Sequence, residues 1–240
     1  MQKRLDAIQP LTLVHESRKI LIVMDTMYFG RAYGVMVFRD WYQHVNLLWK
    51  FVDYETIALY QEGIRELRQM GYEVVAIVVD GRRGIFNNFE GIPIQMCQFH
   101  QSQIVKRYIT SQPKLKAGIE LKWIVDRLSR TDEPSFTGWL KEWYCKWANF
   151  LKETTVHPET NKKCYTHKGL RSAYFSLLHN LPYLFTCQRY FGLGIPTTTN
   201  TLDGSFAHIK DKVRLHRGLK QSRKQKLIEE LLLRKSTTKL

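Results

Sequence analysis

Two apolar runs, each closed by an aspartate, constrain the fold of this chain most strongly. The first spans residues 19–25 and reads KILIVMD, and the second spans residues 72–80 and reads YEVVAIVVD. Short apolar runs rich in Val and Ile are typical of strands buried on both faces of a sheet. The pattern therefore predicts two buried strands with Asp25 and Asp80 at their carboxyl ends, which is where sites collect in open sheets.

The segments around these two runs predict an α/β protein. Two more strands are expected in a hairpin-linked series, then a helix whose apolar residues recur at the helical period, then a last strand and a helix. In chain order these segments are residues 34–40, 45–52, 56–70, 93–96 and about 102–109. Three hairpin-linked strands followed by α/β units indicate a mixed sheet flanked by helices.

The middle of the chain changes character. From about residue 115 to 189 the pattern is helical and aromatic, with few strand signals. We therefore expect three segments: residues 19–110 as the first part of the core, 111–195 as an all-helical insertion, and 196–240 as the return of the core. The last segment is expected to hold one helix beginning near Asn200 and a second, basic helix at about 222–235.

The charge of the chain favours a polyanionic partner. Its 240 residues carry a formal charge of +15, with a pI near 9.7. From Gly204 to the end, eleven Lys and Arg face three acidic residues, a balance of +8. Such a chain suits nucleic acid or an acidic membrane surface; a solvated basic face with no ordered partner is the alternative.

Other features of the composition bear on the compartment. The chain has four cysteines, which disfavours a disulfide-framed secreted fold. We find neither a signal-peptide pattern nor an apolar run of membrane-spanning length. We therefore expect a cytoplasmic protein without a membrane partner.

Three aspartates could together bind metal. Asp203 follows Thr199 and Asn200 at the start of a helical pattern, and would join Asp25 and Asp80. Carboxylates are preferred ligands of hard divalent cations. Two such ions about 4 Å apart can serve the attacking and leaving oxygens of phosphodiester cleavage. The alternative is that each is an ordinary strand-end or helix-start aspartate.

With these aspartates, two further segments carry a family resemblance: C-Q-F-H at residues 97–100, and T-N-x-x-D at residues 199–203. Over roughly residues 19–233 the chain resembles the DDE transposases of bacterial insertion sequences, particularly the Mutator-like group with a ribonuclease-H-like core. The resemblance implies a helical insertion between the second and third acids. It also implies two Mg²⁺ (or Mn²⁺) ions on Asp25, Asp80 and Asp203, with His100 near them positioning phosphate or transferring a proton.

The activity that the resemblance implies is cleavage of transposon ends, followed by attack of the freed 3′-hydroxyl on target DNA. A homodimer or higher assembly on DNA, in the bacterial cytoplasm at the nucleoid, is implied with it. A nuclease with the same core, or a decayed remnant that only binds DNA, are the alternatives.

The chain departs from the family pattern in two places. The third acid is usually glutamate and is Asp203 here; Asp211 and Glu229 are weaker substitutes because neither follows the T-N segment. About 18 residues precede the first expected strand. We therefore expect a truncated copy without the family's N-terminal DNA-binding module.

Several residues are expected to contact DNA. Asn200 with Thr199 is interpreted as a helix N-cap that fixes the direction of Asp203. One tryptophan of the stripe at residues 139, 143 and 147 could stack on an unpaired base, although such stripes usually belong to the core. The expected DNA-binding residues are Arg82, Arg83, Asn200, Lys210, Arg214, Arg217 and Trp143.

The two C-x-x-H segments leave a further alternative open. Cys97 and His100 could pair with Cys164 and His167 in a Cys₂His₂ zinc site. Otherwise Cys97 is a packed cysteine and His100 a capping or buried histidine.

Overall fold

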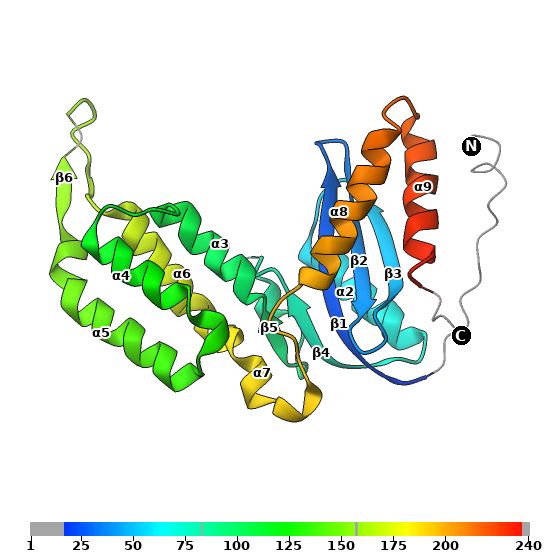
Figure 1. Ribbon diagram of the computed structural model, residues 1–240, viewed down its shortest axis with the longest axis horizontal. Coiled ribbons are helices and arrows are strands. Elements are labelled where there is room, and N and C mark those ends of the chain that lie inside the picture. The colour runs from blue at the N-terminus through cyan, green and yellow to red at the C-terminus, as the bar shows by residue number, and fades with distance from the viewer. Residues whose placement is uncertain (1–16, 83, 157, 237–240) are drawn as a thin grey trace. The chain divides into compact units, whose positions relative to one another are not determined.

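The computed structural model describes residues 17–82, 84–156 and 158–236, which form two compact units (Figure 1). The first unit takes in the chain up to Ile94 and again from Thr199 onward, and the second spans Gln95–Thr198. The first unit is therefore assembled from both ends of the sequence, with the second inserted between them.

The strands β1 to β5 form one mixed sheet of order β3-β2-β1-β4-β5, of which β1 to β4 lie wholly in the first unit. The first three strands pair antiparallel in series, whereas β1 and β4 are parallel. This confirms the expected α/β class with a mixed sheet flanked by helices. The strands are β1 (Lys19–Phe29), β2 (Tyr33–Asp40), β3 (Val45–Val52), β4 (Glu73–Val79) and β5 (Ile94–Met96), and a short 3₁₀ turn, η1 (Ile85–Asn87), lies between the last two.

Strand β1 is longer than the sequence predicts. It continues to Phe29, so the expectation that it ends at Asp25 is wrong. The last pair with β4 joins Val23 to Val78, but pairing with β2 continues to Phe29 and Tyr33. The hairpin with β2 extends the strand, because aromatic and β-branched residues after Asp25 suit a pleated surface.

Helix α2 (Ile57–Gln69) covers one face of the sheet, close to its expected position. The Thr56 side chain caps it by accepting a hydrogen bond from Leu59 N at 3.2 Å. A Cβ built on Gly63 would lie only 2.1 Å from Cζ of Phe38. Gly63 thus lets the helix backbone approach β2, and it identifies the face to which Phe38 points.

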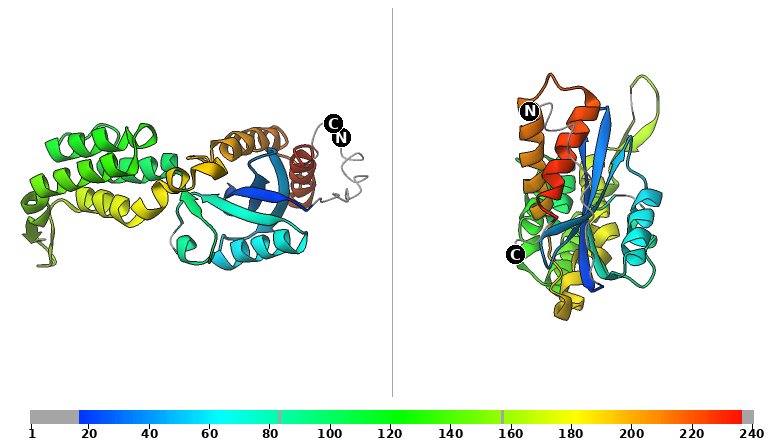
Figure 2. Two further views of the ribbon diagram at one scale, coloured as in Figure 1. Left: turned by 90° about the horizontal axis from the view of Figure 1, so that it is seen from below. Right: turned by 90° about the vertical axis from the view of Figure 1, so that its right-hand side faces the viewer.

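Helices α8 (Asn200–Leu215) and α9 (Gln221–Leu233) cover the opposite face (Figure 2). α8 packs on β1, and α9 packs on α8. The buried Asn46 of β3 ties α9 to the sheet: its side-chain amide donates to Leu232 O at 3.1 Å, and its backbone N–H to Lys235 O at 2.9 Å. These two helices confirm the helical ending predicted from the sequence.

The second unit is mainly helical. It also holds a hairpin that the sequence did not predict, formed by β6 (Thr154–Val156) and β7 (Lys163–Tyr165). It begins at Gln95 rather than at residue 111, because α3 packs on α6 within this unit. Its helices are α3 (Gln98–Ile109), α4 (Lys116–Val125), α5 (Glu133–Lys152), α6 (Lys168–Leu184) and α7 (Thr186–Arg189), with 3₁₀ turns η2 (Leu128–Arg130) and η3 (Phe191–Leu193).

Buried amides join the elements of the second unit. Gln95 and Gln98 both donate to Leu184 O, at 2.9 and 2.8 Å, and Asn180 donates to Gln101 at 2.7 Å. Buried polar groups need such partners, and these contacts fix α3 against α6. Apolar periodicity does not register such contacts, which explains why the sequence assigned α3 to the wrong side of the boundary.

Candidate metal site and nucleic-acid interface

The parallel pairing of β1 with β4 brings Asp25 and Asp80 to the same end of this strand pair. The last pair is Val23 with Val78; Asp25 lies two residues beyond it on β1, and Asp80 lies two residues beyond it, directly after β4. Neighbouring strands lie about 4.8 Å apart. Two carboxylates at such positions can therefore reach one cation.

Asp25 points away from α2. Phe38 faces α2 and pairs with Met24, and side chains alternate along a strand, so Asp25 faces the other side of the sheet. Thr26 again faces α2, with its hydroxyl 3.2 Å from the hydroxyl of Tyr60. The face of Asp25 is the one covered by α8 and α9 (Figure 2).

Local hydrogen bonds orient both carboxylates. Oδ1 of Asp25 accepts from Thr26 N at 2.7 Å, and Oδ1 of Asp80 accepts from Arg82 N at 3.2 Å. The second contact is a turn directly after β4. Both aspartates are thus held by their own backbone at the point where the β1–β4 pairing ends.

Asp203 lies in the first turn of α8, on the helix that packs against β1. The expected N-cap is wrong in its detail, because Thr199 makes no side-chain cap hydrogen bond and Asn200 is an exposed residue already inside the helix. Instead the buried Thr199 hydroxyl donates to Oδ2 of Asp203 at 3.3 Å. Thr199 therefore orients Asp203 directly.

The three aspartates do not form one cluster. Among residues 17–82, 84–156 and 158–236, no three His, Cys, Asp or Glu side chains come together in a group that could hold an ion. The structure brings Asp25 and Asp80 to the same end of the β1–β4 pair and places Asp203 on the helix that packs on β1. The weaker substitute Asp211 is two-thirds exposed and pairs with Arg214 at 3.3 Å.

Glu55 is a buried acid that the sequence analysis missed. It is 8% exposed, it accepts a hydrogen bond from the Tyr60 hydroxyl, and its Oε2 lies 2.8 Å from Nη1 of Arg82. Its backbone N–H donates to the Tyr28 hydroxyl at 2.9 Å. Burial, and then the charge of Glu55, raise the pKa of Tyr60 far above its ordinary value, so Tyr60 remains a proton donor. The only signal in the sequence was an acidic residue directly before the cap of α2.

The structure gives Arg82 a partner other than phosphate. One guanidinium nitrogen pairs with the Glu55 carboxylate and the other donates to the Glu55 carbonyl. Because 39% of the Arg82 side chain is still exposed, its outer edge can also meet a ligand. Arg83, the other arginine expected to touch DNA here, lies outside the described residues.

The basic residues expected near the third aspartate lie along α8 and its end. Lys210 and Arg214 are exposed on the helix, and Arg217 is exposed in the turn that follows it. Arg214 shares its charge with Asp211. Exposed cations on the helix above the carboxylates are arranged as a phosphate-binding surface requires.

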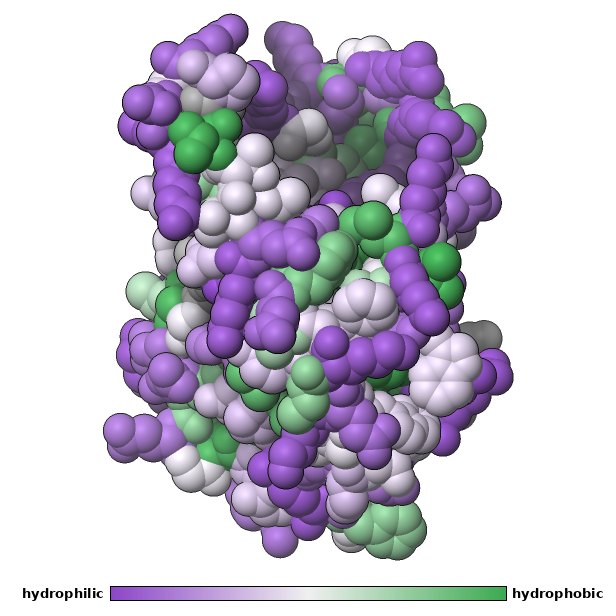
Figure 3. All heavy atoms as spheres, turned by 90° about the vertical axis from the view of Figure 1, so that its left-hand side faces the viewer, coloured by the Kyte–Doolittle hydropathy of each residue, from purple (hydrophilic) through white to green (hydrophobic). Residues whose placement is uncertain are grey.

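Trp143 is a core residue, which corrects the expectation that it stacks on a base. It is 3% exposed, its Nε1 donates to Ala117 O at 2.9 Å, and its ring stacks on Tyr174 with centroids 5.5 Å apart. Next to Trp143, another tryptophan of the stripe lies at a more exposed position. The ring of Trp139 contacts the half-exposed ring of Trp123, with centroids 5.4 Å apart. On the face in Figure 3, hydrophobic side chains stand as scattered green patches among purple hydrophilic ones.

The zinc alternative is wrong, because its two halves lie at opposite ends of one helix. Cys97 directly precedes α3, which has 12 residues and so a length of about 18 Å. At the far end of α3, a Cβ on Gly169 would lie 2.5 Å from Tyr108 O, so Cys164 and His167 lie near that end. Cys97 is fully buried, as a packed cysteine would be. His100 lies in the first turn of α3, in the second unit.

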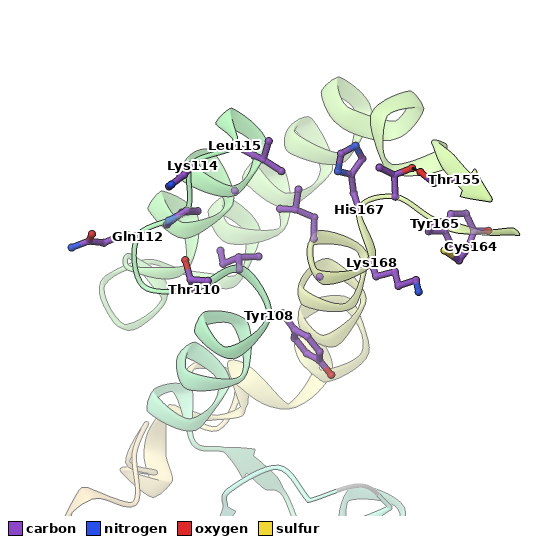
Figure 4. Close-up of a pocket in the computed structure, with 16 residues that line it drawn as sticks. Tyr108, Thr110, Gln112, Lys114, Leu115, Thr155, Cys164, Tyr165, His167 and Lys168 are labelled. Carbon is purple, nitrogen blue, oxygen red and sulfur yellow. Dashed lines mark hydrogen bonds between the residues drawn. The ribbon is translucent and has the colours of Figure 1, made fainter. Parts of the chain in front are cut away.

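A cavity of about 640 Å³ lies within the second unit, between the end of α3, the starts of α4 and α6, and the hairpin (Figure 4). Figure 4 shows Thr110, Gln112 and Lys114 on one side of it and His167 on the other. Nε2 of His167 is 3.0 Å from Oε2 of Glu153, and its ring stacks on Phe150 at 3.6 Å. These contacts give His167 a structural role in joining the hairpin to the helices.

No protein-family model matches the chain, and no curated protein matches it significantly. Across the described part of the chain, no helix combines the length and the apolar character needed to cross a membrane. The fold and site therefore define an α/β protein with a mixed five-stranded sheet, one aspartate on β1, a second directly after the neighbouring strand β4, and a third on the helix that packs on β1.

Proposed function

We propose that this chain is the catalytic domain of a DDE-type DNA transposase of the Mutator-like group, with a ribonuclease-H-like core. The carrying observation is that Asp25 lies on β1, on the sheet face that α8 covers, and that Asp80 directly follows β4, the strand that runs parallel to β1. The helical unit between Asp80 and Asp203 also supports the proposal, because the resemblance implies an insertion between the second and third acids.

The donor set fits Mg²⁺ or Mn²⁺. Both are hard cations that prefer carboxylate oxygens, and Asp25 and Asp80 supply such oxygens at the same end of the β1–β4 pair. The resemblance implies that Asp203 would join them and that two ions would bind. Bound there, the ions would supply an activated water or 3′-hydroxyl and stabilise the leaving oxygen.

The side chains around the aspartates orient them and bind the substrate. Thr199 holds Asp203 through its hydroxyl, and Glu55 holds Arg82 in one orientation beside Asp80. The substrate is DNA, whose phosphates the exposed Lys210, Arg214 and Arg217 would bind, and Asn200 would contact it beside Asp203. A homodimer would hold two transposon ends together.

The test is metal-dependent nicking of a supercoiled plasmid by the full chain. Asp25→Asn and Asp80→Asn should each reduce nicking to the level without enzyme. Asp53→Asn should retain it, because Asp53 is an exposed aspartate of the same unit. If Asp203 is the third acid, Asp203→Asn should abolish nicking and Asp211→Asn should retain it. Retained nicking in either Asp25→Asn or Asp80→Asn would refute the proposal.

Metal binding can be measured without activity. Mg²⁺ or Mn²⁺ should raise the thermal midpoint of the wild-type chain and not that of Asp25→Asn, because a ligand that binds only the folded state stabilises it. A strand-transfer assay distinguishes a transposase from a nuclease, because only a transposase joins the cut DNA end to a second DNA. A wild-type chain that binds DNA yet nicks nothing in either metal would identify the decayed remnant.

A further inference from the structure

A second cavity, of about 380 Å³, lies in the first unit where the β1–β2 turn meets the ends of α8 and α9. Four cationic side chains line it, with two aromatic rings from the sheet side. Six of its lining residues carry the argument: Phe29, Tyr33, Lys210, Arg214, Arg217 and Lys224. The combination of four cationic side chains from the helices with two aromatic rings from the sheet distinguishes this cavity from the one in the second unit.

The cations of this cavity are poorly neutralised. Arg214 pairs with Asp211 at 3.3 Å, and both side chains are about two-thirds exposed, so that pair is weak. Within the described segments, no carboxylate forms an ion pair with Lys210, Arg217 or Lys224. A cavity with this excess of positive charge attracts an anion.

The aromatic side of the cavity holds a buried hydroxyl with no partner. Tyr33 is 5% exposed, and its hydroxyl makes no hydrogen bond to any described residue. Its ring stacks on Phe29 with centroids 5.3 Å apart and leans on Phe51 at 6.0 Å, which fixes its position. Burial raises the pKa of this hydroxyl, so it remains a proton donor. A buried donor without an acceptor is costly, and a ligand oxygen would satisfy it.

We propose that this cavity is a phosphate subsite that binds the backbone of a DNA strand, with the Tyr33 hydroxyl donating to a phosphate oxygen and Lys210, Arg217 and Lys224 neutralising its charge. The lining residues alone support binding of an anion. That the anion is a phosphate of DNA rests on the proposed function.

The position of the cavity suits such a subsite. Phe29 lies four residues beyond Asp25 on β1 and on the same face, a distance of about 13 Å at the strand rise. Lys210 lies seven residues beyond Asp203 on α8, about 10 Å along the helix. A DNA strand carries one phosphate per roughly 3.4 Å of helix axis. The subsite would therefore bind a phosphate about three or four nucleotides from the bond between the aspartates.

The experiment measures binding of a fluorescein-labelled DNA duplex by anisotropy, in EDTA so that no cleavage occurs, across a series of salt concentrations. Arg217→Gln and Lys224→Gln should each weaken binding and lower the slope of log affinity against log salt by about 0.9, as loss of one phosphate contact does. Lys212→Gln is the matched control, because Lys212 is exposed on α8 and does not line the cavity.

Tyr33→Phe separates a ligand-binding hydroxyl from a structural one. It should weaken DNA binding roughly tenfold at an unchanged salt slope, because a neutral donor to a charged acceptor is lost. Its thermal midpoint without DNA should stay level or rise, because an unsatisfied buried hydroxyl is removed. The opposite directions of these two effects exclude misfolding as the cause.

Two outcomes would overturn the proposal. One is wild-type DNA affinity in Tyr33→Phe; the other is cavity variants that bind DNA no more weakly than Lys212→Gln. If inorganic phosphate at matched ionic strength stabilises wild type but not Tyr33→Phe in the first case, the cavity binds free phosphate and not DNA. Plasmid nicking that depends on Asp25 and Asp80 would then still support the proposed function, so the two proposals fail separately.

Discussion

Gly63 is the tightest packing position between α2 and the sheet, and Gly63→Ala tests it. A Cβ there would lie 2.1 Å from Cζ of Phe38 and 2.6 Å from both its Cε atoms. Carbon atoms in contact normally lie about 3.5–4.0 Å apart, so the two must separate by more than 1 Å. Phe38 has no exposed surface and its ring packs edge-on against Tyr60, so it has no free space to enter.

Two opposing effects decide the sign. Alanine is favoured over glycine inside a helix by about 1 kcal/mol. Overpacking a filled core costs typically 1–3 kcal/mol and sometimes more, and here the added carbon overlaps three ring atoms. We therefore expect Gly63→Ala to lower the free energy of unfolding by about 2 kcal/mol. Urea unfolding followed by circular dichroism measures it.

Gly204→Ala is the matched control for this substitution. Gly204 also lies inside a helix of the first unit, and a Cβ there meets no atom within 4 Å. It should stabilise the unit by up to about 1 kcal/mol. In a Phe38→Leu background, Gly63→Ala should cost at least about 1 kcal/mol less than in wild type, because the two side chains compete for one space. A Gly63→Ala chain as stable as Gly204→Ala would refute this account of the packing.

Three further substitutions test other contacts of the fold. Asn46→Ala should cost about 0.5–1.5 kcal/mol in urea unfolding, because one buried hydrogen bond is lost while the Lys235 N–H and the Ser236 hydroxyl still donate to Leu232 O; an unchanged midpoint would contradict this. The pKa of Tyr60 is raised from 10.0, mainly by burial, so the folded chain keeps a proton that the unfolded chain releases. The stability that this gives is complete below pH 10 and is lost as the pH rises above it. Tyr60→Phe should therefore reduce the pH dependence of the free energy of unfolding measured between pH 8 and 11. Trp143→Phe should lower the thermal midpoint, because the contact with Ala117 O is lost, while DNA affinity in an anisotropy titration stays within about twofold; a tenfold loss would restore Trp143 to the DNA interface.

The sheet was predictable because its signals are local. The runs ending at Asp25 and Asp80 consist of apolar residues that cannot be solvated, and their length fits strands. The end of β1 was not predictable in the same way. Residues 26–29 join the strand through pairing with β2, and the run of buried residues that defined the strand does not extend over them.

The candidate site was predictable in its acids and not in the groups that surround them. Asp25 and Asp80 follow apolar runs, so their position at one edge of a parallel pair could be inferred. The burial of Glu55 depends on Arg82 and Tyr60, which come from other elements. Likewise, Trp143 and its neighbours form one stripe in the sequence, and only the packing of α4 and α6 on α5 separates the buried ring from the exposed edge.

The connection between the units explains how Asp203 reaches the same sheet as the other two aspartates. Near its two ends the second unit returns on itself, because Gln98 N donates to Thr197 O at 2.8 Å. When the two ends of an inserted unit lie close together, the two segments of the host chain that flank the insertion also lie close together. The host then folds as if residues 94 and 199 were near neighbours, and α8 packs on β1 directly after the return. Sequence separation between Asp80 and Asp203 therefore measures the size of the insertion and not a distance within the first unit.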